Sequence, residues 1–207
     1  MAPDDVDEQA AEKWQQSKSA LMEASLGKEH NLVMHALIPY FLGGSLDLYY
    51  YPNGLPGTAI ATKELCELPN KGPTNDVYRS YELVMFTRHA LDLDAVKSEN
   101  TDFGKAHANI NAILNCIARY SAMAKLNPNE TCEFPEEMER LGGKCLIFDG
   151  YACRSDDLVK DFGLLAIIEI FRSEQEYART HGGSRLIRRL KSKGYYPYSD
   201  LDRRPVA

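Results

Sequence analysis

Thiols and imidazoles are the side chains in this sequence best suited to nucleophilic chemistry. There are five cysteines and five histidines, and a thiolate activated by a neighbouring imidazole is a common catalytic nucleophile. His107 and Cys116 lie nine positions apart in one predicted helix. That is more than two turns, so they cannot touch. A Cys–His site would have to join distant segments, for example Cys66, His89 and nearby carboxylates. We keep such an enzyme, of unknown reaction, as an alternative function.

The motifs of known catalytic and cofactor sites are missing from the sequence. It has no phosphate-binding glycine loop, no nucleophile elbow and no His-Glu-x-x-His metal motif. His30 and His35 are five positions apart and would not share a helix face. Paired carboxylates such as Glu136-Glu137 have the composition of exposed loops. We therefore expect no catalytic residue, no metal and no cofactor.

The cysteines also indicate a cellular compartment. Their number is odd, their spacing is wide and no Cys-x-x-Cys occurs, which fits reduced thiols better than a disulfide framework. The first five residues are acidic and lack the apolar run of a signal peptide. No stretch approaches the roughly 20 apolar residues of a membrane span. The sequence therefore predicts a cytoplasmic protein without a membrane segment.

Charge narrows the class of partner. The 207 residues include 24 Lys and Arg against 30 Asp and Glu, a net charge of −6. A negative field favours a basic protein partner and opposes nucleic acid or anionic lipid. The C-terminal part is an exception, because residues 184–193 form a basic predicted helix. That helix is the one nucleic-acid candidate, so nucleic-acid binding is the less favoured prediction.

Aromatic and acidic residues between positions 45 and 79 form the candidate binding surface. In residues 45–51, Leu46, Leu48 and Tyr50 alternate with Asp47, Tyr49 and Tyr51. A strand would place the first three side chains on one face and the other three on the opposite face. Tyrosine is enriched at protein interfaces, although packing inside the sheet would explain the same tyrosines. A loop over residues 67–79, rich in Pro, Gly and Asn, follows closely and could present a variable edge. The predicted partner-binding residues are Asp47, Tyr49, Tyr51, Glu64, Glu67 and Asp76.

Hydrophobic periodicity predicts the elements that must position these residues. Helices are expected over residues 8–26 and 103–125, and strands over 45–51, 58–65, 81–87, 144–149 and 162–171. The last strand is almost wholly apolar, as in a central strand. Ser173, with Glu176 three residues later, and Ser184 are expected to cap two C-terminal helices. Residues 31–42 are apolar, but their pattern identifies neither a helix nor a strand. The order predicts an α+β fold with helices packed on a mixed, largely antiparallel, curved sheet.

Several short motifs occur in the order typical of one family. They are Ile60-Ala61-Thr62, Ser80-Tyr81-Glu82-Leu83-Val84, Ile117-Ala118-Arg119-Tyr120, Phe162-Gly163-Leu164-Leu165-Ala166-Ile167-Ile168 and Asp200-Leu201-Asp202-Arg203-Arg204. In this order and spacing the sequence resembles the suppressor of fused domain, over about residues 29–206. The resemblance divides the chain into an N-terminal helical segment, residues 1–28, and a suppressor-of-fused-like domain, residues 29–207.

The resemblance implies a protein-binding domain without catalysis. Animal members hold Gli-type transcription factors with the help of a second domain, which these residues do not include. Bacterial members are usually single domains, and some are immunity proteins of secreted toxins. We therefore expect a bacterial immunity protein that occludes a toxin, or alternatively a regulator that binds a transcription factor. One departure is Glu64, where bacterial members carry glycine in a Thr-x-Gly-Met-Ser motif; it predicts a different turn.

Overall fold

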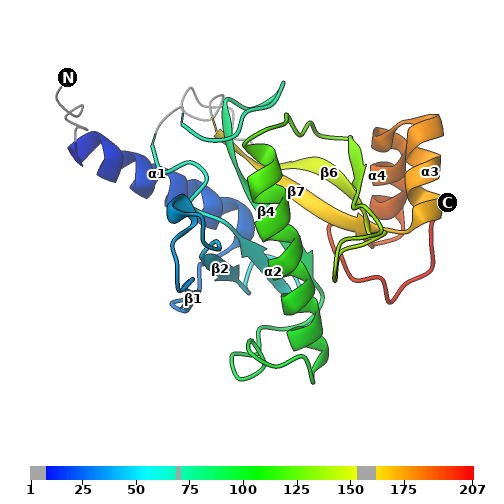
Figure 1. Ribbon diagram of the computed structural model, residues 1–207, viewed down its shortest axis with the longest axis horizontal. Coiled ribbons are helices and arrows are strands. Elements are labelled where there is room, and N and C mark those ends of the chain that lie inside the picture. Colours follow the sequence, from blue (N-terminus) through cyan, green and yellow to red (C-terminus); the bar gives the residue numbers. More distant parts are fainter. Residues whose placement is uncertain (1–7, 69–70, 153–161) are drawn as a thin grey trace.

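The computed structural model describes residues 8–68, 71–152 and 162–207 (Figure 1). Cys153 and the pair Asp156-Asp157 lie outside them. In the described residues the helices are α1 (Glu8–Leu26), α2 (Asp102–Ser121), α3 (Arg172–His181) and α4 (Gly183–Ser192), with one 3₁₀ turn, Tyr40–Leu42. The strands are β1 (Val33–Met34), β2 (Leu48–Tyr51), β3 (Thr58–Ala61), β4 (Ser80–Thr87), β5 (Thr131–Glu133), β6 (Cys145–Ala152) and β7 (Phe162–Ile170).

These strands form one sheet in the order β1-β2-β3-β4-β7-β6-β5. All neighbours are antiparallel except β4 and β7, which pair in parallel with Leu83 opposite Leu165. The α+β class and the largely antiparallel sheet are confirmed. The apolar strand β7 lies inside the sheet, between β4 and β6, and all of its residues are buried.

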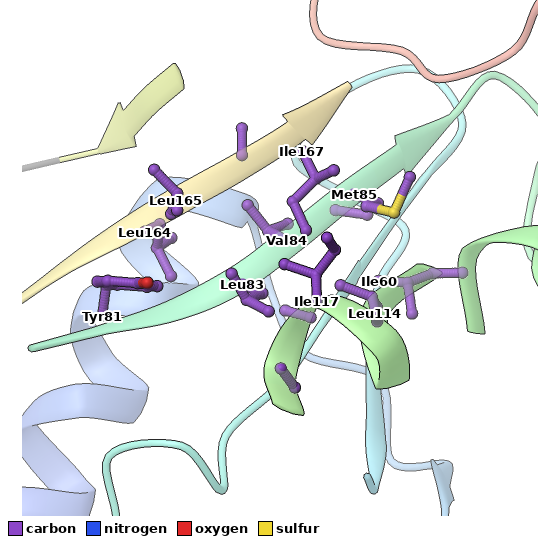
Figure 2. Close-up of a cluster of buried hydrophobic side chains, with 14 of the residues drawn as sticks. Ile60, Tyr81, Leu83, Val84, Met85, Leu114, Ile117, Leu164, Leu165 and Ile167 are labelled. Carbon is purple, nitrogen blue, oxygen red and sulfur yellow. The ribbon is translucent and has the colours of Figure 1, made fainter. Parts of the chain in front are cut away.

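Helices cover both faces of the sheet. Leu83 in β4 points toward Leu114 and Ile117 of α2 (Figure 2). The next residue back, Glu82, contacts Lys18 of α1, and successive residues of a strand face opposite sides. Thus α2 covers one face and α1 covers the other. The core between α2 and the sheet includes Ile110, Ile113, Leu114 and Ile117, all at most 2% exposed.

The face opposite α2 carries two groups of helices. Helices α3 and α4 pack their apolar side chains, among them Leu186 and Leu190, on Ile168 and Ile170 of β7. Helix α1 places Trp14, Leu21, Met22 and Leu26 in the same core cluster as the sheet. The division of the chain at residue 28 stays a prediction, but α1 packs as part of this core. No helix in the described residues has the length and apolar character to cross a membrane.

The element boundaries differ from the expected ones where side chains replace backbone pairing. Strand β3 ends at Ala61, because the following turn donates its backbone amides to Glu82. Helix α3 begins at Arg172, so Ser173 lies inside the helix and does not cap it. Phe171 occupies the N-cap position, and its backbone amide donates a hydrogen bond to the carboxylate of Glu174. Gly182, not Ser184, precedes α4. The short strand β5 was not expected.

Candidate protein-binding surface

Asp47, which directly precedes β2, connects three segments. Its carboxylate accepts a hydrogen bond from the amide of Ala36 at 2.8 Å and lies 2.6 Å from Nδ1 of His35. Its own amide donates to the carboxylate of Glu64 at 2.8 Å. The side chain is only 16% exposed. Asp47 therefore fixes the beginning of the segment that follows β1.

That segment exposes large apolar side chains. Leu37, Ile38, Phe41 and Leu42 are between 58% and 104% exposed. We call these four residues the apolar segment. Single exposed apolar residues are common, whereas several together mark interaction sites. Asp47 accepts its hydrogen bond from Ala36, the residue directly before the apolar segment.

The far end of the apolar segment is also fixed. Arg119 of α2 donates to the carbonyls of Gly43 and Gly44 at 3.3 and 3.1 Å. Gly43 has a φ of +87°, which favours glycine. A Cβ on Gly44 would lie 1.7 Å from the carbonyl oxygen of Ile38, so only glycine fits there. The backbone is thus held in a defined shape with its apolar side chains in solvent.

A pocket of about 360 Å³ adjoins the apolar segment. Its apolar lining includes Met34, Leu37, Ile38 and Leu46, and its polar lining is His35, Ser45 and Asn111 of α2. A pocket with a largely apolar lining and a few polar groups could receive an apolar side chain of a partner.

Carboxylates crowd together beside Asp47. Burial raises the pKa of Glu64, and the charges of Asp47 and Glu67 raise it further, while the hydrogen bond from the Asp47 amide opposes the shift. Glu67 is exposed. A basic group of a partner would relieve this repulsion between like charges. Glu64 itself needs no glycine-like backbone: within the described residues, positive φ outside glycine occurs at Asn129 and Arg140.

The two candidate tyrosines have different surroundings. Tyr49 is partly exposed, and the ammonium of Lys63 lies 4.9 Å from its ring centre. Burial, followed by the charges of Asp47 and Glu64, raises the pKa of Tyr49 to about 12. Tyr51 is 1% exposed, and its hydroxyl donates to Glu29 at 2.8 Å. Tyr51 therefore lies in the core on the α1 side of the sheet and presents no surface to a partner.

Asp76 lies apart from this cluster. Its carboxylate pairs with Lys125 at 3.0 Å, just beyond α2, and its amide donates to Asn127. The hydrogen bond and charge of Lys125 lower the pKa of Asp76. The structure thus brings together Asp47, Tyr49, Glu64 and Glu67.

Cys66 and His89 do not form a catalytic pair. Cys66 is fully buried beside the beginning of β4, where its thiol donates to the carbonyl of Tyr81. His89 follows the other end of β4, about 20 Å or more away along an eight-residue strand. Burial raises the pKa of the Cys66 thiol, whereas a nucleophilic cysteine needs a lowered one.

His89 instead lines a separate polar pocket of about 430 Å³. Asp200 lies 3.8 Å from its Nε2 atom, and Lys144, also in the lining, pairs with Glu169 at 2.8 Å. Asn109 also donates to Glu169. These groups bond to one another, and among the described residues no group of three or more His, Cys, Asp or Glu is placed to hold a metal.

Sequence reasoning missed the apolar segment. Its only signal was an apolar run, residues 31–42, that fits neither helix nor strand and is followed by Gly43-Gly44. An apolar run of this kind occurs in exposed binding loops and also in loops buried in the core, so the sequence alone could not distinguish the two.

Solved structures share this fold. A chain in the crystal structure of a Sufu–Fu complex aligns over 95% of this chain and 92% of its own length, with a TM-score of 0.59 and 17% identity. A suppressor of fused homologue from Neisseria gonorrhoeae FA 1090 aligns over 95% and 98%, with a TM-score of 0.57 and 9% identity. Drosophila Suppressor of Fused aligns over 88% of this chain and 47% of its own, with a TM-score of 0.54 and 18% identity. The sequence matches no protein-family model and no curated protein.

Proposed function

The chain has the suppressor of fused fold, and from this we propose that it is a non-enzymatic module that binds a protein partner. The observation that carries the proposal is the apolar segment fixed against Asp47, next to Glu64 and Glu67. Apolar anchors beside a rim of charge are the usual composition of a protein interface. One solved chain with this fold comes from a complex of Sufu with Fu, which supports a protein as the kind of partner.

The partner that fits this surface is basic. Its Lys or Arg side chains would neutralise the carboxylates of Asp47, Glu64 and Glu67, while its apolar side chains would contact Phe41 and the pocket behind Leu37. The net charge of −6 would also speed the encounter with a positively charged domain.

The specific role we propose is that of a cytoplasmic immunity protein that binds the toxic domain of a secreted toxin and covers its active site. Inhibition would be stoichiometric, because occlusion consumes one inhibitor molecule for each toxin molecule. The described cysteines Cys66, Cys116, Cys132 and Cys145 are free thiols, which is consistent with a reducing compartment.

The test begins with a search of the neighbouring genes for a secreted toxin, whose toxic domain is then purified. Wild-type protein should abolish its activity at one molar equivalent. Leu37→Asp/Phe41→Asp should lose inhibition, because it places two charges on the apolar segment. Leu55→Asp/Leu93→Asp, which adds the same two charges at exposed apolar residues elsewhere, is the matched control and should inhibit normally. Complete inhibition by much less than one molar equivalent of wild-type protein would contradict the proposal, and so would full inhibition by Leu37→Asp/Phe41→Asp.

A further inference from the structure

Positive charge is concentrated at one end of the molecule. Residues 172–193, which include α3 and α4, contain seven Lys and Arg against two Glu, although the whole chain has 24 against 30. Figure 1 shows α3 and α4 at one end of the long axis, whereas β1 and β2, near which the apolar segment begins, lie in the other half of the molecule. The charge is therefore separated along the molecule, and a surface of opposite character faces away from the proposed binding site.

Three arginines of α4 are exposed and form no ion pair with a carboxylate of the described residues. Leu186, Ile187 and Leu190 fill the inner face of the helix. Arg185, Arg188 and Arg189 occupy the outer face at the spacing i, i+3, i+4 and are exposed. We call these three residues the basic face. No carboxylate of the described residues forms an ion pair with any of them, whereas neighbouring cations do have partners: Arg172 pairs with Glu133, and Lys191 with Asp149.

Contacts with α3 and the C-terminal segment hold Arg189, one residue of the basic face, in place. Arg189 donates to the carbonyl of Val206 at 2.8 Å and lies 4.3 Å above the ring of Tyr177. The C-terminal segment is held in turn by Arg203, whose guanidinium makes two hydrogen bonds, of 2.6 and 2.8 Å, to the buried carboxylate of Glu174. A surface ordered in advance loses less entropy when a ligand binds.

We infer that the basic face is a second docking surface and that its occupant is an acidic segment of a partner protein. Guanidinium groups bind carboxylates through paired hydrogen bonds. Helix α4 has ten residues, about 15 Å of length, which matches a short run of Asp or Glu. A nucleic-acid duplex, with one charge per about 1.7 Å, would extend past the helix over the acidic remainder of the chain and be repelled. The inference is separate from the proposed function, because it concerns the other end of the molecule.

The experiment measures binding of a fluorescent poly-glutamate peptide and of a DNA duplex at the same ionic strength. The peptide should bind wild-type protein more tightly than the duplex does. Arg185→Glu/Arg188→Glu should weaken peptide binding about tenfold or more. The control Lys13→Glu/Lys28→Glu changes the net charge equally at two exposed lysines in and just after α1, and it should bind the peptide as wild type does.

Two results would overturn the inference. Tighter binding of the duplex would make the basic face a nucleic-acid surface. Equal weakening in both charge-reversal variants would mean that net charge alone, and not this face, controls binding. Leu37→Asp/Phe41→Asp should bind the peptide normally, so failure of this inference and failure of the proposed function can be told apart.

Discussion

The ammonium of Lys18 in α1 lies 3.2 Å from a carboxylate oxygen of Glu82 in β4, and both side chains are fully buried. Lys18 also donates to the carbonyls of Lys63 and Cys66, at 2.7 and 2.9 Å. Glu82 accepts hydrogen bonds from the hydroxyl of Thr62 and the amides of Leu65 and Cys66. One ion pair therefore joins the helix, the turn after β3 and the strand. Such a network is stable only when complete.

Removing one partner of this pair should be strongly destabilising. Lys18→Met leaves the Glu82 carboxylate buried without its counterion and should cost about 3–5 kcal/mol of unfolding free energy, measured by urea titration. The double variant Lys18→Met/Glu82→Gln removes both charges and should regain part of that loss. A single variant as stable as wild type would show that α1 does not dock here.

The two tyrosines of the candidate surface should separate by their effects. Tyr51→Ala should lose about 3–5 kcal/mol of stability, as other buried aromatic residues do. Tyr49→Ala should lose less, because its ring is partly exposed, and should instead weaken binding of the partner. Thermal melts and a binding assay on both variants decide this; equal melting temperatures for the two would contradict the burial of Tyr51.

Packing of α2 on the sheet predicts a further loss. Ile113 and Ile117 are 0% and 2% exposed, so Ile113→Ala or Ile117→Ala should cost about 2–5 kcal/mol through lost contacts and a residual cavity. The exposed neighbour Tyr120 provides the control, since Tyr120→Ala should change the denaturant midpoint little. Midpoints that match wild type for both isoleucine variants would refute this packing.

The free energy of unfolding should fall in alkaline solution, because the buried thiol of Cys132 resists ionisation in the folded protein. Burial, with smaller effects from Cys116 and Cys145, raises the pKa of Cys132 from 9.0 to about 12. The unfolded chain loses this proton first, so the contribution is complete below about pH 9 and declines up to about pH 12, by at most about 1.4 kcal/mol per pH unit. Urea titrations from pH 8 to the alkaline limit should show a shallower decline for Cys132→Ala. An unchanged slope would show that Cys132 does not contribute.

Long elements of this fold could be predicted because their side-chain pattern is dictated by burial. The face of α2 that carries Ile110 to Ile117 repeats at helical spacing, and the apolar run of β7 is typical of a strand covered on both faces. The parallel pairing of β4 with β7 could not be predicted, since apolar strands carry no mark of direction. Strand β5 has three residues, too few for a period to show.

The candidate site was predictable only in part. Alternation predicts one face for Asp47, Tyr49 and Tyr51, but it could not show that this face is covered at Tyr51. The chain that covers Tyr51, near Glu29, is distant from β2 in sequence. The meeting of Asp47 with Glu64 depends on the antiparallel register of β2 and β3, in which Tyr49 lies opposite Ala61. Register is set by the whole core and not by either strand alone.

The sheet ends in β1 and β5, strands of two and three residues, while its longest apolar strand, β7, is enclosed between β4 and β6. Short edges offer few free backbone groups to another chain. Once unfolded, however, the run Phe162–Ile170 would be exposed, and it has the composition of amyloid-forming segments: β-branched, nearly uncharged and without proline. Resistance to aggregation in this protein should therefore depend on how rarely the central strand is released, more than on the chemistry of its surface.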